Sequence, residues 1–348
     1  MRYLDIDTQK RISKIGLGTW QFGAEEWGYG KDYSERVAPA IVRRAVKLGV
    51  TFFDTAEIYA AGRSERILGR ALGPERESIF LAGKIFPVVP GGPLLNLRAK
   101  ASAGRLRTSR LDLYQVHFPN PLGDDSAIMK GMRSLQHSGL IQEVGVSNYS
   151  VPRWCAAERA LGSRILSNQV SYSLVDREPE NDLLPFALQH GRVIIAFSPL
   201  AHGLLSGRYH ERNSPADKVR ATSAHFQPET FAQTKKLMEV LREVAAAHAA
   251  TPAQIALAWA IRHPAVVAIP GASSVEQLES NVAAAEIDLA ADEDQALRAA
   301  LPWSSEPTPQ QPGLRRKLSM ARHCARGGKH LAKTLWRDFR YGTGTATA

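Results

Sequence analysis

Four polar residues stand at or just after the ends of apolar runs of strand length, namely Asp54, Tyr59, Lys84 and His117. A tyrosine phenol has an ordinary pKa of about 10, and an opposite charge within reach typically shifts a pKa by roughly 1 to 3 units. Lys84 would supply this charge, so we expect the pKa of Tyr59 to be lowered into a useful range for proton transfer. Asp54 would pair with Lys84 and keep its ammonium charged. Any one of the four could be a loop cap or a packing group, but together they predict an active site.

The runs that carry these residues are rich in β-branched and aromatic side chains, which indicates strands. The interval from Asp54 to Lys84 is 30 residues (84 − 54), and that from Lys84 to His117 is 33 (117 − 84). Such intervals match one strand, one helix and two loops per unit. We therefore expect successive strand ends to lie side by side in a parallel sheet.

The same alternation of strand-like and helix-like segments continues along the chain. Strands are predicted at 16–20, 50–54, 78–84, 111–117, 141–147, 164–170, 192–198 and 265–271. Helices are predicted at 36–49, 63–73, 95–108, 125–138, 151–161, 180–190, 229–248, 251–263 and 274–284. The simplest closure of this series is an α/β fold, the (β/α)8 TIM barrel. Because barrel chemistry lies at the carboxyl ends of the strands, a single pocket is predicted there.

Composition fits one large barrel with an extension. The chain has 348 residues, 44% of them hydrophobic, and the lack of any run of 18 or more apolar residues predicts no transmembrane segment. The first residues lack the apolar stretch of a secretory signal, so we expect a cytoplasmic protein. Cys155 and Cys324 have no ligand-like spacing, which predicts neither a disulfide nor a metal site.

A basic extension follows the predicted barrel of residues 1–302. Residues 303–313 read as a proline-rich connector and 314–348 as a tail. The formal net charge is +10, and residues 303–348 hold nine Lys or Arg against two acids, or +7. Segment 329–341 has the pattern of a basic amphipathic helix. It could dock on the barrel, stay disordered, or bind a partner or an anionic membrane surface. Nucleic-acid binding from charge alone would be non-specific, so no specific nucleic-acid partner is predicted.

Ordered motifs over residues 11–301 resemble the aldo-keto reductase family. They read GLGTW, FFDTAEIY, GRSERILG, LAGK, LDLYQVHFPNP, GVSNYS, NQVSYS, FSPLAHGLLSGRY and IPGASSVEQLESN. The resemblance implies a (β/α)8 barrel that binds NADP(H) across its mouth without the glycine-rich dinucleotide fingerprint. It implies reduction of an aldehyde, ketone or keto-sugar carbonyl to an alcohol, with Tyr59 as proton donor, Lys84 and Asp54 as its tuning pair, and His117 as the residue that orients the carbonyl.

The resemblance also implies the cofactor contacts, with NADPH expected and NADH as the alternative. The residues implied are Trp20, Ser147, Asn148, Gln169 and Phe197 for the nicotinamide end, Ser198, Pro199, Leu200, Gly203 and Arg208 for the phosphates, and Gly271, Ser273, Gln277 and Asn281 for the adenosine end. Ala272 and Ser280 stand where relatives commonly carry a basic and an acidic residue. Both departures lie at the adenosine end of the site, where the 2′-phosphate of NADPH is distinguished from the free hydroxyl of NADH.

Loops would decide the substrate. Candidates for an apolar pocket above the nicotinamide, or for packing loops on the barrel, are Trp20, Trp27, Tyr29, Phe118 and Tyr149. A rival interpretation is an NADP(H)-binding regulatory subunit that resembles the potassium-channel β subunits. Because those proteins commonly lack a histidine at the position of His117, its presence here favours an enzyme.

Overall fold

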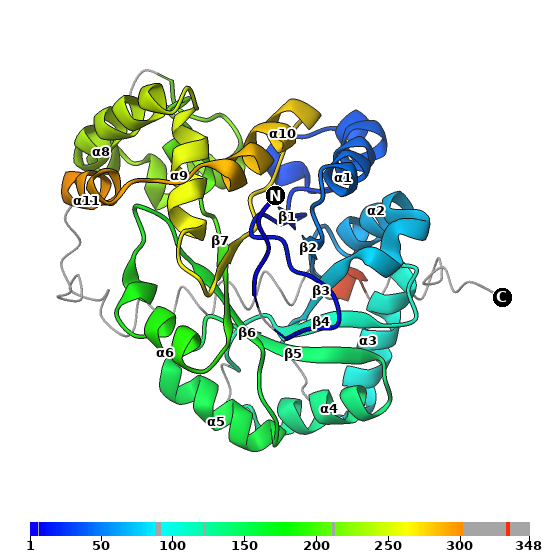
Figure 1. Cartoon of the computed structure of the whole chain (residues 1–348). Helices are drawn as coiled ribbons and strands as arrows, with labels where there is room; N and C mark the ends of the chain where they lie inside the picture. Colours follow the sequence, from blue (N-terminus) through cyan, green and yellow to red (C-terminus); the bar gives the residue numbers. More distant parts are fainter. Residues whose placement is uncertain (6, 88–91, 121–122, 211–212, 302–331, 335–348) are drawn as a thin grey trace.

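The computed structural model describes residues 1–5, 7–87, 92–120, 123–210, 213–301 and 332–334. Within this part of the chain, eight parallel strands form one sheet in sequential order (Figure 1). They are β1 (Leu17–Gly18), β2 (Phe52–Asp54), β3 (Phe80–Ile85), β4 (Leu111–Val116), β5 (Ile141–Ser147), β6 (Ser167–Ser171), β7 (Val193–Phe197) and β8 (Val266–Ala268). The predicted strands are all present, and only β3 and β6 extend one residue beyond the predicted runs.

The two edges of the sheet meet and close the barrel. Ile15, which precedes β1, forms a parallel bridge with Ala268 of β8. The Gly16 N–H donates to the Ala268 carbonyl at 2.8 Å. A Cβ at Gly18 would lie 2.7 Å from the Ile269 carbonyl oxygen, so this close approach requires glycine. The (β/α)8 fold predicted from the sequence is confirmed.

Helices surround the sheet in Figure 1. They are α1 (Ala38–Lys47), α2 (Arg63–Leu72), α3 (Gly92–Arg105), α4 (Ser126–His137), α5 (Val151–Leu161), α6 (Leu183–Gln189), α7 (Lys218–Ala221), α8 (Pro228–Ala247), α9 (Pro252–Ile261), α10 (Val275–Ala283) and α11 (Ala291–Ala300). Helix α6 begins later than predicted because Glu178–Glu180 forms a separate 3-10 turn, and α7 and α11 were not predicted. In the described residues no single helix is long and apolar enough to cross a membrane, although α8 and α9, bent by 93°, pass that test together by length and composition.

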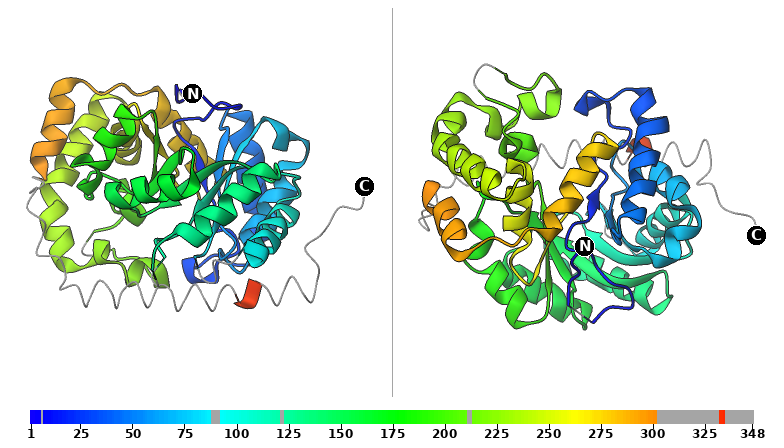
Figure 2. Two further views of the ribbon diagram at one scale, coloured as in Figure 1. Left: turned by 90° about the horizontal axis from the view of Figure 1, so that it is seen from below. Right: turned by 45° about the horizontal axis from the view of Figure 1, so that its top comes forward.

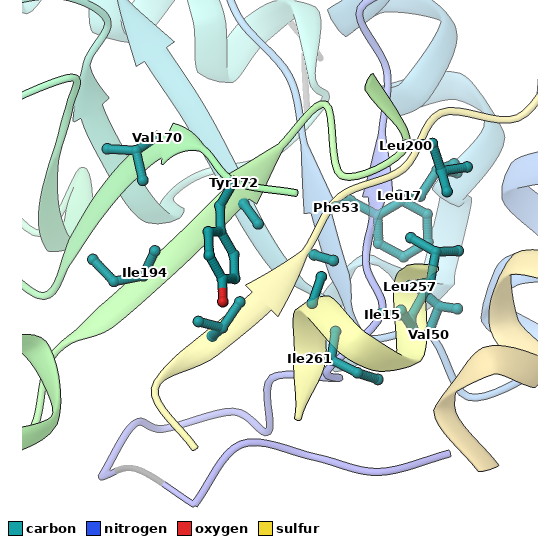
Figure 3. Packing of buried hydrophobic residues seen from close by; sticks show 14 of the residues in the cluster. Ile15, Leu17, Val50, Phe53, Val170, Tyr172, Ile194, Leu200, Leu257 and Ile261 are labelled. Carbon is teal, nitrogen blue, oxygen red and sulfur yellow. The ribbon is translucent and has the colours of Figure 1, made fainter. Parts of the chain in front are cut away.

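Successive side chains of each strand point to opposite sides of the sheet. In β2, Phe53 packs outward into the layer between strands and helices, which Figure 3 shows with Leu17, Ile194 and Leu257. Phe52 belongs to the smaller cluster inside the barrel. Further apolar members of the inner cluster are Phe80, Leu113, Leu166, Val193, Ile195 and Val267. The barrel therefore has an apolar interior, and the positions left for polar residues on the same face lie toward the strand ends.

The two ends of the barrel are covered differently. Near the N-terminus, Tyr3 forms an antiparallel bridge with Ser13, and Lys10 donates to the carbonyl of Ile79 at the start of β3 at 2.8 Å. This segment therefore covers the amino ends of the strands. Figure 2 shows the short helical turn of residues 332–334, in red, at the opposite end. The remainder of the predicted connector and tail lies outside the described residues.

Candidate active site

Lys84 lies at the centre of the site. It projects from β3 and is 0% exposed, and its Nζ donates to Asp54 Oδ2 at 2.5 Å. The same nitrogen donates to the Tyr59 hydroxyl and to the Thr55 carbonyl, both at 3.1 Å. Three oxygen acceptors thus hold one ammonium group, and Asp54 compensates its charge. The structure thus brings three predicted residues, Asp54, Tyr59 and Lys84, into direct contact.

His117 follows β4 by one residue and faces the same centre. Its ring centroid lies 5.6 Å from that of Tyr59, at an interplanar angle of 79°. Phe118 stacks on the imidazole at 4.7 Å and 3°. Among the described residues, Nδ1 of His117 has no hydrogen-bond partner. All four predicted residues therefore converge on one centre.

Electrostatics at the site depart from the sequence expectation at one residue. Burial alone would lower the pKa of Lys84, but Asp54 and Tyr59 raise it above its usual value. Burial raises the pKa of Tyr59, and although Lys84 acts in the opposite direction, the net shift is upward. The expected lowering of the Tyr59 pKa was wrong, because the phenolate loses more from desolvation than it gains from the cation. Burial, with Lys84 second, holds the pKa of His117 well below its usual range, so both Tyr59 and Lys84 carry protons near neutral pH while His117 is neutral.

A left-handed turn places Tyr59 between β2 and α2. Ala60, Ala61 and Gly62 have φ values of 47°, 52° and 75°, a conformation that costs an alanine roughly 1 kcal/mol or more. The backbone N–H of Tyr59 donates to Ala56 O at 3.1 Å, and that of Ser64 donates to Tyr59 O at 3.4 Å. The turn therefore fixes the backbone on both sides of the phenol.

Two glutamine amides complete the environment of Asp54. Gln169 Nε2 donates to Asp54 Oδ1 at 2.8 Å, and Gln115 Nε2 donates to the same oxygen at 3.3 Å. Gln169 was predicted to bind the nicotinamide, whereas Gln115 was not predicted as a site residue. A signal for Gln115 existed, since it lies two residues before His117 in the predicted strand 111–117 and two successive residues on one strand face are two positions apart.

The residues implied for the nicotinamide end lie around this centre. Ser147 Oγ donates to the Gln169 carbonyl at 2.8 Å, and the exposed Asn148, with φ of 61°, donates from Nδ2 to Ser147 Oγ at 2.9 Å. Phe197 is half-buried at the end of β7. Trp20 is 39% exposed, and its ring lies 6.3 Å from that of Tyr59. Exposed amide and aromatic groups beside Tyr59 fit a planar ring that carries a carboxamide.

The residues implied for the phosphates follow β7. Ser198 and Gly203 have φ values of 50° and 104°, so the loop curls sharply. Pro199 and Leu200 are buried beneath it, and Arg208 is exposed. A sharply curled loop followed by an exposed cationic side chain, Arg208, fits a diphosphate.

The residues implied for the adenosine end gather at the start of α10. Ser273 donates from its N–H and hydroxyl to Gln277 Oε1, at 2.6 and 2.8 Å. Asn281 is 3% exposed and donates to the Gly271 carbonyl at 3.2 Å, so it holds this loop from behind. A helix N-terminus favours negative charge, and this end of the site fits a phosphate. The individual contacts stay predictions.

The five candidate pocket aromatics separate into two groups. Trp20 and Trp27 pack edge to face at 5.0 Å beside Tyr59, and Phe118 stacks on His117. Tyr29 instead stacks on Tyr33 at 4.4 Å. Tyr149 is 1% exposed and belongs to the cluster between strands and helices. Of the two roles predicted for Tyr149, its burial in that layer favours packing over the pocket.

Comparison with known proteins identifies the family to which this chain belongs. Residues 14–302 match the model of the Aldo/keto reductase family. An uncharacterized oxidoreductase of Mycobacterium bovis is 54% identical over 297 residues, which cover 85% of this chain and 92% of the relative. The chain belongs to the aldo-keto reductase family.

Two further similarities connect this reductase to named activities and ligands. The methylglyoxal reductase YeaE of Escherichia coli is 33% identical over 296 residues, covering 84% of this chain and 92% of that protein. A crystal structure of an aldo/keto reductase from Klebsiella pneumoniae in complex with NADP and acetate has a TM-score of 0.70 and 30% identity, covering 87% of this chain and 96% of that one. This reductase is accordingly an oxidoreductase, as predicted.

Proposed function

We propose that this reductase converts an aldehyde, ketone or keto-sugar carbonyl to an alcohol with NADPH, and that Tyr59 donates the proton. The observation that carries the proposal is the contact of one buried ammonium, Lys84 Nζ, with both the Tyr59 hydroxyl and Asp54. NADPH would supply the hydride. The protein must then deliver a proton to the developing alkoxide, which requires a positioned acid.

The protonation states of Tyr59, Lys84 and His117 suit this task. Tyr59 carries its proton near neutral pH, since the ordinary pKa of a tyrosine is about 10 and burial shifts the pKa of Tyr59 further upward, so a proton is in place for transfer. Once the proton leaves, the phenolate lies 3.1 Å from the Lys84 ammonium, and this charge stabilises it. A neutral His117, whose pKa is lowered by burial, donates a hydrogen bond that orients the carbonyl. The same residues serve alcohol oxidation in reverse.

NADPH is preferred over NADH in this proposal. A relative of 30% identity was crystallised with NADP, and the exposed Arg208 and the N-terminus of α10 offer positive potential for phosphate groups. Ala272 supplies no cation, and its carbonyl accepts hydrogen bonds from Gln21 and Tyr33. Specificity for the 2′-phosphate would therefore depend on other groups at this end.

The test is consumption of NADPH, with NADH in parallel, over a panel of aldehydes, ketones and keto-sugars that includes methylglyoxal. Tyr59→Phe removes only the hydroxyl, so turnover should fall to background while NADPH still quenches protein fluorescence. Turnover that survives this substitution would reject Tyr59 as the proton donor. Cofactor binding without turnover of any carbonyl would favour the regulatory interpretation.

A further inference from the structure

Glu57 lies two residues before Tyr59 and is 1% exposed. Its carboxylate accepts a hydrogen bond from the Phe86 N–H at 2.7 Å, and its own N–H donates to the Lys84 carbonyl at 3.3 Å. Phe86 immediately follows β3, the strand that carries Lys84. Two bonds thus join the Tyr59 loop to β3, one on each side of Ile85. The side chain of Glu57 continues the pairing of the strands at the point where the loop leaves the sheet.

Arg98 of α3 compensates the charge of Glu57. Its guanidinium is 2% exposed and forms an ion pair with both carboxylate oxygens, with Nε 3.2 Å from Oε2. The same guanidinium donates to the Phe86 carbonyl at 2.7 Å. Glu57 and Arg98 therefore bind both polar backbone groups of Phe86. A buried pair of this kind is costly to desolvate and serves geometry better than stability.

A third contact comes from the C-terminal extension. Thr334 is 1% exposed, and its hydroxyl donates to the Glu57 carbonyl at 3.2 Å. Its Cγ2 would also lie 3.4 Å from a Cβ at Gly62, which ends the left-handed turn after Tyr59. The extension thus contacts the same loop from the outer side.

We infer that Glu57 is a positioning residue, which sets the distance between the Tyr59 hydroxyl and the Lys84 ammonium by fastening the Tyr59 loop to the end of β3. This inference rests on the proposed role of Tyr59. Glu57 acts through the loop, since its carboxylate is engaged by Phe86 and Arg98. Proton transfer is sensitive to such positioning, because a misplacement of about 1 Å can cost about 100-fold in rate.

Two double variants isolate this role. Glu57→Gln with Arg98→Met removes both charges and keeps an acceptor for the Phe86 N–H, whereas Glu57→Leu with Arg98→Met has the same charge balance and a similar volume but no acceptor. We expect the glutamine pair to keep kcat within about threefold of the parent, and the leucine pair to lose at least about tenfold in kcat, with KM changed by less than about twofold. Recovery by glutamine is a readout that a merely structural role would not give, because both pairs lose the salt bridge.

A matched control lies at the other end of β3. Asp112, 0% exposed, accepts from the Leu81 N–H at 2.9 Å and pairs with Arg76 at 2.8 Å. Asp112 also pairs with Lys10 at 2.9 Å, so Asp112→Leu with Arg76→Met and Lys10→Met removes a comparable buried arrangement at the amino end of the barrel. We expect it to lower Tm and to leave kcat unchanged.

Equal kcat values for the two Glu57 double variants, in proteins that fold and quench with NADPH, would overturn the inference. If Tyr59→Phe also abolishes turnover, the proposed function survives that result. Full turnover by Tyr59→Phe would instead overturn the proposed function and this inference with it. Should the leucine pair fail to fold, Glu57→Met with Arg98→Met decides, because its unbranched side chain has a similar volume and likewise offers no acceptor to the Phe86 N–H. A drop of at least about tenfold in kcat relative to the glutamine pair at constant KM supports the inference, and an equal kcat rejects it.

Discussion

At the scale of single residues, burial sets the protonation states that reduction requires. Burial raises the pKa of Tyr59 above its ordinary value and holds that of His117 well below its own. The active form of Tyr59 is protonated, so it is lost only as pH rises through its raised pKa. The active form of His117 is neutral, so it is lost only as pH falls through its lowered pKa. We therefore expect kcat/KM for carbonyl reduction to be flat between about pH 6 and 8.

Steady-state rates over this range, at saturating NADPH, check the prediction. His117→Gln should keep the flat profile and lower kcat/KM, because glutamine retains a donor but not the ring geometry. A midpoint of activity loss between pH 6 and 8 in the parent, absent from His117→Gln, would show that His117 ionises there and contradict the assignment.

Lys84 is the residue whose loss should be most specific for the chemical step. Lys84→Met removes the cation that stabilises the phenolate, and we expect kcat to fall by about 100-fold or more while NADPH still binds. Lys14→Met is a matched control, since Lys14 is also buried and its Nζ donates to three backbone carbonyls, at 2.8 to 2.9 Å, but at the amino end of the barrel. Both variants should lower Tm, and only the first should lower kcat. Equal kcat losses would mean that Lys84 acts through folding.

At the scale of elements, the turn between β2 and α2 stores strain in two alanines. Ala61 has φ of 52°, so Ala61→Gly relieves the steric cost of the left-handed conformation and should raise the free energy of unfolding by up to about 1 kcal/mol. Ala101→Gly, in the middle of α3, should lower it by about 1 kcal/mol. Urea unfolding of both variants checks the two signs. Destabilisation by Ala61→Gly would mean that the entropy of glycine in the unfolded chain outweighs the relief of strain.

Local signals predicted most elements. β5 and α5 begin and end where expected, because the β-branched residues Ile141, Val144 and Val146 mark the strand, and Pro152 near the start and Gly162 after the end mark the helix. Helix α11 was missed because only Leu297 of it is buried, which leaves little periodic signal. The pairing of Glu57 with Arg98 could not be predicted, because the partners lie 41 residues apart and meet only in the folded loop. The upward shift of the Tyr59 pKa was equally hidden, since the sequence shows the charges but not their burial.

At the scale of the whole molecule, the barrel separates stability from chemistry along its axis. At the amino end, the segment of Tyr3 to Ser13 covers the strands, and Asp112 is held by Lys10 and Arg76. At the carboxyl end, the buried ion pair of Lys84 with Asp54 faces the predicted cofactor site. Substitutions of equal burial should thus lower Tm at either end of the barrel, but kcat only at the carboxyl end.

The C-terminal extension contacts the Tyr59 loop at the carboxyl end of the barrel through Thr334, so its removal should lower kcat. Deleting residues 314–348 removes the hydrogen bond to the Glu57 carbonyl. Because such a bond typically contributes about 0.5 to 1.5 kcal/mol, we expect kcat to fall by roughly two- to tenfold with little change in Tm. Thr334→Val in the full chain should reproduce most of this loss, since it removes the same donor and leaves every charge of the extension in place.

Sedimentation of both proteins with phosphatidylserine vesicles tests a separate prediction, namely that the basic charge of the extension binds an anionic surface. The deletion should abolish any binding that Thr334→Val retains. A deletion with parental kcat would show that the loop is held without the extension, whatever the vesicles bind.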